Sequence, residues 1–354
     1  MGIKIQLYFP CSNPDNTGMS QQALLFVNLG SPLSYDVNDV KAYLKEFLMD
    51  PYVLDIPYLL RWFVVQRILK TRPPETAEAY REVWTKNGAP LIVLSQQLMD
   101  LIAEKIKVPI ALGMRYAEPS IDMAICDLLR RHPSIEQIKL IPLYPHYALS
   151  STETVIAKTK RVLAKRCPHV KLTWVASFFD HPAYIAALAD RLQKSLPSDY
   201  DAILFSYHGL PERHIMKSDP TASHCQLNEA CCQTPSEAHK TCYVHQVKQT
   251  TRLLVQACNL EPKKMSLAFQ SRLGKDPWVR PYTDEEVMRL VEKGVKRLVV
   301  ISPSFVADCL ETIEELGMRL KEDFLKAGGE SFTLIPCLNT DQKWVDALAQ
   351  IAAD

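Results

Sequence analysis

The sequence predicts an α/β fold with two similar doubly wound, Rossmann-like domains, each with a parallel sheet, and a cleft between them. First, short apolar runs typical of buried strands alternate with longer patterns typical of helices. This alternation indicates parallel sheets covered by helices. Second, segments of the first half of the chain resemble segments of the second half in the same order. That order indicates two copies of one strand–helix unit.

Each apolar run is assigned to a strand and each amphipathic stretch to a helix. The expected strands are 23–28, 108–113, 137–143 and 171–176, followed by 201–206, 265–270, 297–302 and 332–336. The expected helices include 90–105, 119–131, 150–166, 180–195 and 283–293.

Three pairs of segments carry the internal repeat. The pairs are ALLFVNLGSP (23–32) with AILFSYHGLP (202–211), LGMRY (112–116) with FQSRL (269–273), and IPLYPHYALSSTET (141–154) with ISPSFVADCLETIE (301–314). The first copy is longer between its first two strands, so we expect an insertion near 50–90. The predicted domains are 22–177 and 178–354, preceded by a disordered leader at 1–21.

The composition is that of an ordinary globular protein, with 47% hydrophobic and 23% charged residues. A net charge of +1 excludes nucleic acid as a bulk electrostatic partner. No apolar run reaches the ~18 residues of a membrane-spanning helix, and the first 22 residues have no signal-peptide pattern. We therefore expect a cytoplasmic protein with mostly reduced cysteines, in which clustered cysteines indicate metal binding rather than disulfides.

The stretch AILFSYHGLP (202–211) predicts an active-site histidine. Its first four residues form a buried strand that ends in His208, and Gly209 and Pro211 then turn the chain sharply. Open α/β sheets bind ligands at the carboxyl ends of their strands, so His208 is expected at the catalytic edge of the second sheet. The alternative is a histidine that only caps the loop through a hydrogen bond.

Acidic residues follow the third strand of the second domain. Asp308, Glu311, Glu315 and Arg319 are spaced so that they form one stripe on a helix. Stacked carboxylates repel one another unless they share protons or a cation. The stripe is either a solvated acidic face or part of a site in the cleft, and Glu311 is the favoured residue of such a site.

The insertion contains the apolar stretch PYVLDIPYLLRWFVVQRIL (51–69), which includes Trp62 and Phe63. One interpretation is a helix packed against its own domain. The other is an apolar lip that lines a pocket for a flat ligand or rests on a bilayer.

Together, the motifs of the chain resemble those of the ferrochelatases, enzymes that insert ferrous iron into a porphyrin. The resemblance runs from residue 22 to the end and rests on NLGSP (28–32), GMRY (113–116), YPHY (144–147), SYHGLP (206–211), FQSRLGKDPW (269–278), FVADCLETIEE (305–315) and LN (338–339). It implies that His208 and Glu311 are catalytic and lie on opposite sides of the porphyrin. It also implies a wide, π-type turn that brings Glu315 into line with Glu311. Which of His208 and Glu311 takes the protons and which handles the iron stays open.

The implied reaction is insertion of iron into protoporphyrin IX, the last step of haem biosynthesis. The alternatives are coproporphyrin III as the substrate, a cobalt chelatase, and a porphyrin or iron carrier without turnover. The residues expected to contact the porphyrin are Leu29, Arg72, Tyr80, Arg115, Tyr116, Tyr144, Trp278 and Phe305. Arg72 and Arg115 suit carboxylates. Many relatives have a serine near a propionate where this chain has Ala89, so these arginines and Tyr80 are expected to replace that anchor.

A cysteine-rich insertion, SHCQLNEACCQTPSEAHKTCYVHQ (223–246), follows the histidine turn. Its four thiols, Cys225, Cys231, Cys232 and Cys242, indicate a zinc or iron–sulfur site. The resemblance to ferrochelatases that carry a [2Fe–2S] cluster favours iron–sulfur. Alternative ligands are Cys258, His224, His239 and His245. Besides porphyrin and iron, the expected partners are the inner face of the membrane, as a peripheral contact, and the haem-pathway proteins that act before and after this one.

Overall fold

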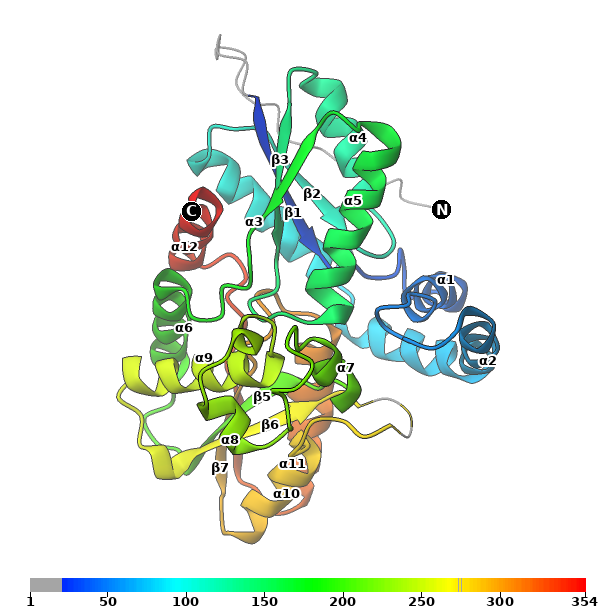
Figure 1. The fold of residues 1–354 in the computed structure, drawn as a ribbon. Coiled ribbons are helices and arrows are strands. Elements are labelled where there is room, and N and C mark those ends of the chain that lie inside the picture. The colour runs from blue at the N-terminus through cyan, green and yellow to red at the C-terminus, as the bar shows by residue number, and fades with distance from the viewer. Residues whose placement is uncertain (1–20, 273, 275) are drawn as a thin grey trace.

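The computed structural model describes residues 21–272, 274 and 276–354. It contains two four-stranded parallel sheets, in the orders β2–β1–β3–β4 and β6–β5–β7–β8, one above the other in Figure 1. The strands are β1 (Gln22–Asn28), β2 (Ile110–Met114), β3 (Gln137–Pro142), β4 (Lys171–Trp174), β5 (Ala202–His208), β6 (Met265–Gln270), β7 (Arg297–Ile301) and β8 (Ser331–Leu334). The predicted fold class is confirmed. The predicted leader, except for Gln21, lies outside the described residues.

Helices flank both sheets (Figure 1). The α-helices are α1 (Val37–Leu48), α2 (Tyr58–Val83), α3 (Pro90–Lys105), α4 (Ile121–Arg131), α5 (Thr154–Arg166), α6 (Pro182–Ser195), α7 (Glu212–Lys217), α8 (Glu229–Gln233), α9 (Tyr243–Ala257), α10 (Thr283–Glu292), α11 (Lys321–Lys326) and α12 (Gln342–Ala353). The π-helices are η1 (Leu149–Glu153) and η4 (Glu311–Leu320), and the 3₁₀ turns are η2 (Glu237–Lys240) and η3 (Pro262–Lys264). Side-chain caps begin several helices, for example Ser120 on α4 and Asp341 on α12.

The strand order places the candidate site. In each sheet the first strand along the chain, β1 or β5, lies between the next two, so the chain leaves it toward opposite sides. Such a switch point opens a crevice at the carboxyl ends of the strands, which is where doubly wound sheets bind ligands. Asn28 ends β1 and His208 ends β5.

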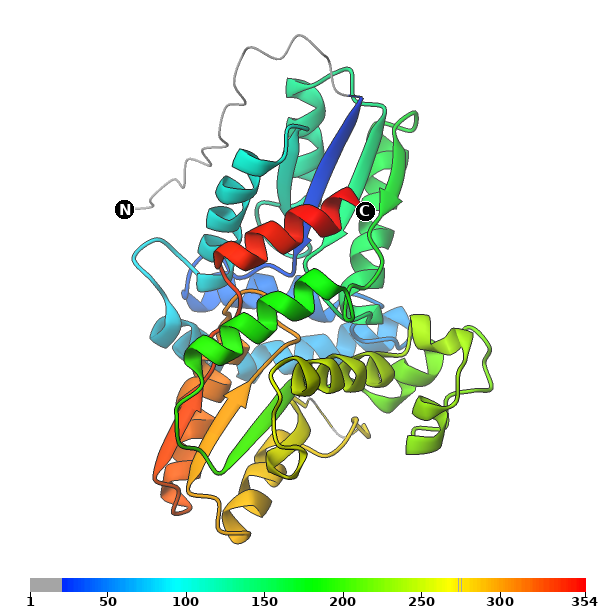
Figure 2. The same cartoon turned by 90° about the vertical axis from the view of Figure 1, so that its left-hand side faces the viewer.

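The two halves share one large hydrophobic cluster, and each sheet also has a cluster of its own. Phe26 of the first sheet and Phe205 of the second belong to the same cluster of buried side chains. The C-terminal helix α12 joins them, because it packs against α6 and also against α3 of the first half. Figure 2 shows α12 in red beside α6 in green across the junction of the sheets. The division of the chain at residue 177 stays a prediction.

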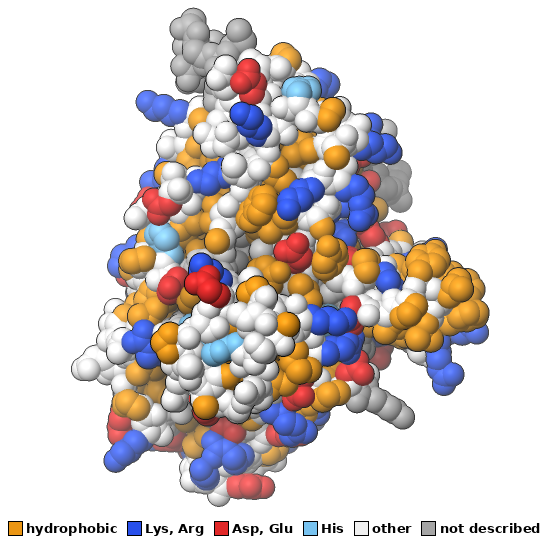
Figure 3. Space-filling view, in the orientation of Figure 1, with side chains coloured by type: hydrophobic (Ala, Val, Ile, Leu, Met, Phe, Trp, Pro, Cys, Tyr) orange, Lys and Arg blue, Asp and Glu red, His pale blue; other side chains and the backbone are white. Residues whose placement is uncertain are grey.

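The expected insertion near 50–90 contains α2, which packs against the preceding helix α1 through residues such as Val40, Leu44, Val65 and Leu69. The outer face of α2 is different, because Leu59 is 72% exposed and Phe63 63% exposed. Figure 3 shows hydrophobic side chains gathered over this region at the right of the view. The helix therefore has one packed face and one apolar face without cover from the described part of the chain.

Candidate active site

A cavity of about 130 Å³ lies at the junction of the two sheets. It brings together six of the residues predicted from the sequence, namely Leu29, Tyr80, Tyr144, His208, Phe305 and Glu311. Its walls are mostly apolar or aromatic. His208 and Glu311 come from the second half of the chain. Few convergent polar groups in an apolar pocket are typical of a small-molecule site.

His208 is held at the end of β5 by three hydrogen bonds. Its Nδ1 lies 2.7 Å from the carbonyl oxygen of Gly209, its backbone N–H donates to Ser304 Oγ at 3.0 Å, and Tyr243 donates to its carbonyl at 2.7 Å. A carbonyl oxygen can only accept, so Nδ1 carries the proton in the neutral ring. The Nε2 lone pair of His208 is therefore available to accept a proton from a ligand.

Gly209 allows this tight turn. A Cβ atom at this position would lie 2.8 Å from the carbonyl oxygen of Gln270 and 3.3 Å from the ring of Trp278. Trp278, a predicted porphyrin contact, thus packs behind the His208 turn and is not among the described residues that line the cavity.

Glu311 begins the π-helix η4. The wide turn implied by the family resemblance is therefore present, and π-helices recur at functional sites. Glu315 follows in the same helix and accepts a hydrogen bond from Ser271 Oγ at 2.5 Å. Burial, above all, and the nearby Glu311 carboxylate raise the pKa of Glu315, against the opposing effects of Ser271 and His208. Glu315 itself lies outside the described cavity lining.

The remaining residues of the acidic stripe do not face the cavity. Asp308 accepts hydrogen bonds from Thr312 and from the side chain of Asn339, at 3.0 and 2.6 Å. Arg319 pairs with Glu314 at 2.7 Å. Asp308 is therefore used to brace the start of η4.

The predicted anchor Arg115 is engaged elsewhere. Its guanidinium forms an ion pair with Asp50, whose side chain is 1% exposed, and donates to Thr154 Oγ1 at 2.7 Å. Tyr116 donates to the same carboxylate at 2.9 Å and is fully buried. Arg72 is exposed on α2. The structure does not bring these three predicted contacts to the described cavity lining.

The structure adds cavity residues that sequence reasoning missed, among them Tyr43, His146, Tyr243 and Ser304. Thr250 donates its hydroxyl proton to Phe179 O at 2.7 Å, so it must accept from His146 Nε2 at 2.9 Å. Burial lowers the pKa of His146 to about 3, which keeps the ring neutral. Its motif, YPHY, was noticed in the sequence, but nothing local distinguished this histidine as a cavity residue.

The four cysteines of the insertion lie near one another. Cys232 and Cys242 interact through a side-chain hydrogen bond that raises the pKa of the first thiol and lowers that of the second. Cys225 is within electrostatic reach of Cys231 and Cys232. Nevertheless, no three His, Cys, Asp or Glu side chains in the described part of the chain are grouped so that they hold a metal ion.

The three histidines predicted as alternative metal ligands make hydrogen bonds to the backbone instead. Ring nitrogens of His224 and His239 lie 2.8 and 3.0 Å from the carbonyl oxygen of Cys231, and His245 Nδ1 lies 3.0 Å from that of Cys232. These nitrogens act as donors that brace the Cys231–Cys232 backbone.

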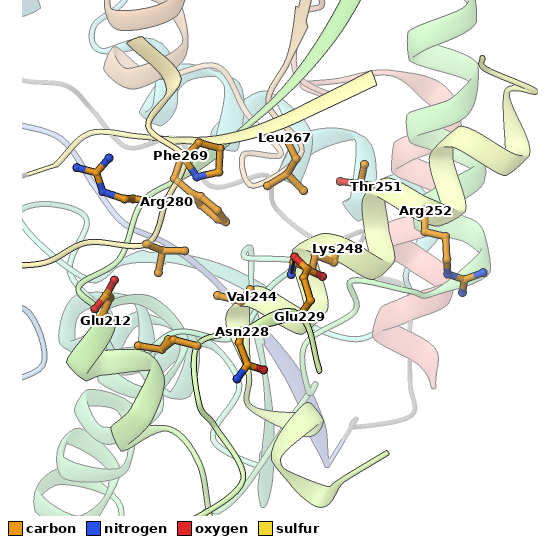
Figure 4. Close-up of a pocket in the computed structure, with 13 residues that line it drawn as sticks. Glu212, Asn228, Glu229, Val244, Lys248, Thr251, Arg252, Leu267, Phe269 and Arg280 are labelled. Carbon is orange, nitrogen blue, oxygen red and sulfur yellow. Dashed lines mark hydrogen bonds and ion pairs between the residues drawn. The ribbon is translucent and has the colours of Figure 1, made fainter. Parts of the chain in front are cut away.

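A second, larger hollow of about 680 Å³ lies beside the cysteine insertion, between α9, β6 and residues 279–281. Figure 4 shows Lys248 beside Glu229, paired at 2.6 Å, while Arg252 and Arg280 point outward at opposite ends. No histidine or cysteine lines the described wall of this hollow. The smaller cavity, with His208 and Glu311, is therefore the candidate active site.

No helix among the described residues has the length and apolar character needed to cross a bilayer.

The chain was compared with known proteins. A family model described as Ferrochelatase matches residues 21–354. The chain is 45% identical over 337 residues to a ferrochelatase of Stutzerimonas stutzeri, covering 95% of this chain and 98% of the relative. It is 46% identical over 335 residues to a ferrochelatase of Pseudomonas fluorescens, covering 94% and 98%. In fold it is similar to SirB from Bacillus subtilis with Fe³⁺, with a TM-score of 0.53 and 13% identity over 94% of this chain and 95% of SirB.

Proposed function

The chain belongs to the ferrochelatase family, and we propose that it inserts ferrous iron into protoporphyrin IX at the cavity lined by His208 and Glu311. Iron insertion into a porphyrin follows from the family. The observation that carries the proposed site is the meeting of a histidine with a free Nε2 and a carboxylate in one apolar cavity.

Two pyrrole protons must leave the porphyrin as Fe²⁺ enters. We assign their removal to His208, because its Nδ1 proton is engaged by Gly209 and its Nε2 is free to accept. The raised pKa of Glu315 suits it to receive a proton from the histidine. Both protons can pass this way in turn, since each transfer to Glu315 and then to solvent returns His208 to its neutral form.

Glu311 is proposed to contact the iron. It lines the cavity, and carboxylate oxygen is a suitable ligand for labile Fe²⁺. The neighbouring Cys309 thiol stays neutral, because burial and then the Glu311 carboxylate raise its pKa. The π-helix thus presents an anionic oxygen to the metal and keeps the adjacent sulfur protonated.

The choice of protoporphyrin IX depends on charge. No Lys or Arg is among the described residues that line the cavity. Protoporphyrin IX has two carboxylates and coproporphyrin III has four, so the latter requires more cationic anchors. The weakly basic site favours the porphyrin with fewer acidic groups.

The test is anaerobic incubation of the purified protein with Fe²⁺ and, separately, protoporphyrin IX, coproporphyrin III and sirohydrochlorin. Porphyrin consumption is followed by absorbance, and kcat/KM is compared. The proposal requires the highest value for protoporphyrin IX. A preference for coproporphyrin III would overturn the substrate assignment, and binding without consumption of any of the three would indicate a carrier.

We further propose that Cys225, Cys231, Cys232 and Cys242 hold a [2Fe–2S] cluster. The donor set suits it, since four thiols from a short insertion converge and three of them are buried. They are not already arranged as ligands, so binding has to draw the sulfurs together. Cys258 is not part of this group, because its thiol faces the carbonyl of Ala189 at 3.7 Å. The cluster would supply structural bracing of the insertion.

The outer face of α2 is proposed to rest on the cytoplasmic surface of a membrane. Tyr58, Leu59, Leu60, Trp62 and Phe63 are all at least 42% exposed. Arg67 and Lys70 on the same helix are exposed as well. Apolar side chains beside basic ones are typical of peripheral binding to anionic lipid.

The membrane proposal is tested by cosedimentation with phosphatidylglycerol vesicles. Trp62→Ser with Phe63→Ser is expected to lower the partition coefficient at least about tenfold, with a parental melting temperature because both rings are exposed. The matched control is Trp174→Ser, since Trp174 on β4 is also 42% exposed. Equal partition of the double variant and the parent would contradict the proposal.

A further inference from the structure

We infer that Gln270 is a positioning residue for iron insertion: it fixes where His208 and Glu311 lie relative to each other. The inference rests on the proposed function, because it names the residue that holds the proposed base and the proposed iron contact in place. Gln270 is the last residue of β6 and is 3% exposed. It is not among the described residues that line the cavity, so it acts on the chemistry through its neighbours.

The main chain of Gln270 holds the histidine turn. In the parallel pairing of β5 with β6, Gln270 stands opposite His208. The backbone N–H of Gly209, the residue after His208, donates to the carbonyl oxygen of Gln270 at 2.7 Å. This bond depends on the glycine, since a Cβ atom there would lie only 2.8 Å from the same oxygen. The end of β6 therefore sets the position of the His208 turn.

The side chain of Gln270 holds Glu311. Its Nε2 donates to the backbone carbonyl oxygen of Glu311 at 3.1 Å, and its Oε1 accepts from Ser206 Oγ at 2.8 Å. The reverse orientation of the amide would place Oε1 against the carbonyl oxygen of Glu311, and neither oxygen can donate. Because Glu311 is the first residue of η4, the bond from Nε2 anchors the first turn of the π-helix. One residue thus bonds both to the His208 turn and to Glu311.

Ser206 keeps the amide in this orientation. Its hydroxyl is fully buried and gives its single proton to Gln270, so Thr283 Oγ1 donates to Ser206 Oγ at 2.8 Å. The fold itself does not require a hydroxyl here, since Val27 has the place of Ser206 in the first copy of the internal repeat and is also fully buried. The polar chain from Thr283 to Glu311 therefore serves the site rather than the sheet.

The test compares single-turnover rates of iron insertion after rapid anaerobic mixing of the protoporphyrin IX complex with Fe²⁺. Gln270→Met keeps the length of the side chain and removes its hydrogen bonds, so the rate is expected to fall about 10–100-fold, as for a small misplacement of reacting groups. The Kd of protoporphyrin IX, measured by fluorescence without iron, is expected to stay near the parental value because Gln270 does not line the described cavity. Ser266→Ala is the matched control, since it removes the bond from Ser266 to Glu286 on the same strand, and its rate is expected to equal that of the parent.

A double-mutant cycle separates positioning from a general structural effect. Because Gln270 acts through Glu311, Gln270→Met is expected to slow the Glu311→Gln variant by at most about threefold, as for residues that act as a unit. The main-chain bond to Gly209 is kept in both backgrounds, so the cycle isolates the side-chain bond to Glu311. A loss as large as that in the parent would show that Gln270 acts independently of Glu311 and would overturn the inference.

Gln270→Met leaves the Ser206 hydroxyl and the Glu311 carbonyl without that partner, which destabilises the folded state. If this variant does not fold, Gln270→Met with Ser206→Val decides, because both side chains of the buried pair are then apolar and valine is the residue of the first copy. The rate of this double variant is expected to stay low, and a parental rate would overturn the inference. A parent that consumes no porphyrin, or that is unaffected by Glu311→Gln, would instead overturn the proposed function.

Discussion

At the level of single residues, the proposed chemistry depends on which nitrogen of His208 holds a proton. The bond from Nδ1 to Gly209 O decides this, and the bonds of the backbone to Ser304 and Tyr243 hold the turn in place. The backbone therefore holds a base that lines the cavity and leaves Nε2 as its unprotonated nitrogen. This arrangement uses the histidine in its neutral form as the proton acceptor.

Replacing His208 with Ala is expected to lower the single-turnover rate of iron insertion by ~10²–10⁴-fold, as for loss of a positioned base. Porphyrin affinity and the melting temperature are expected to remain near the parental values, because the half-buried ring lies at a sheet edge. Rates come from absorbance after rapid mixing with Fe²⁺. Substantial turnover in the variant would show that the protons leave by another route.

Glu315 gives a pH-dependent prediction. Its raised pKa means that the folded state binds the proton more tightly than the unfolded state. The free energy of unfolding therefore decreases as the pH rises from about the ordinary value of 4.5 through the folded-state pKa. Glu315→Gln removes this pH-dependent loss, so the melting temperature of the variant relative to the parent is expected to increase across that range. A pH-independent difference in thermal scans would contradict the assignment.

At the level of elements, the cysteine insertion has little apolar material with which to fold. Its α8 and η2 are single short turns. Three imidazoles brace the backbone of Cys231 and Cys232 from different parts of the insertion. For such a segment, binding of a metal cluster can supply folding free energy that apolar burial does not.

Anaerobically purified protein is expected to be reddish-brown and to contain about two iron and two sulfide per chain. Cys225→Ser or Cys242→Ser is expected to remove the colour and most of the activity, because the insertion follows the His208 turn. Cys126→Ser and Cys167→Ser, in the first half, are the controls and are expected to change neither. A colourless, fully active parent would contradict the cluster and leave the family assignment intact, whereas one zinc per chain would indicate a structural zinc site.

At the level of the whole molecule, the two halves are joined by α12 as well as by the site. Trp344 on this helix is fully buried and lies with its ring 6.0 Å from those of Phe178 and Tyr184. Lys139 on β3 donates to the carbonyl oxygen of Ala352 at 2.9 Å. The C-terminal helix therefore links the last part of the chain to the first sheet.

Trp344→Ala is expected to lower the free energy of unfolding by about 3–5 kcal/mol through the cavity it leaves. Because Trp344 belongs to the hydrophobic cluster that the two halves share, the backbone amides of both sheets are expected to lose protection from hydrogen exchange together. The measurement is hydrogen exchange at β1 and β5 under increasing denaturant. Trp174→Ala, at an exposed position, is the control. Loss of protection in only one sheet would show that the halves fold independently.

The sequence predicted the features that depend on a local residue pattern, namely the strands and the His208 turn. Apolar runs between helical stretches predicted all eight strands to within a few residues, and the His208 turn was recognised from Gly209 and Pro211. Local preference does not account for α2, which continues through Pro73 and Pro74 although proline is unfavourable in a helix interior. Pro73 is buried in this helix, and tertiary packing overrides the local preference there.

In the candidate site, too, some features follow from local sequence and others only from the tertiary structure. By itself the sequence determined the fold class, the family resemblance, and His208 and Glu311 as the residues to examine, because each is marked by a motif or by its place after a strand. Only the tertiary structure decided that Arg115 pairs with Asp50, that His146 lines the cavity, that one face of α2 is exposed, and that Gln270 bonds to the carbonyl oxygen of Glu311. These contacts join residues far apart in the chain, and no local pattern specifies which charged or apolar groups become neighbours when two sheets close on each other.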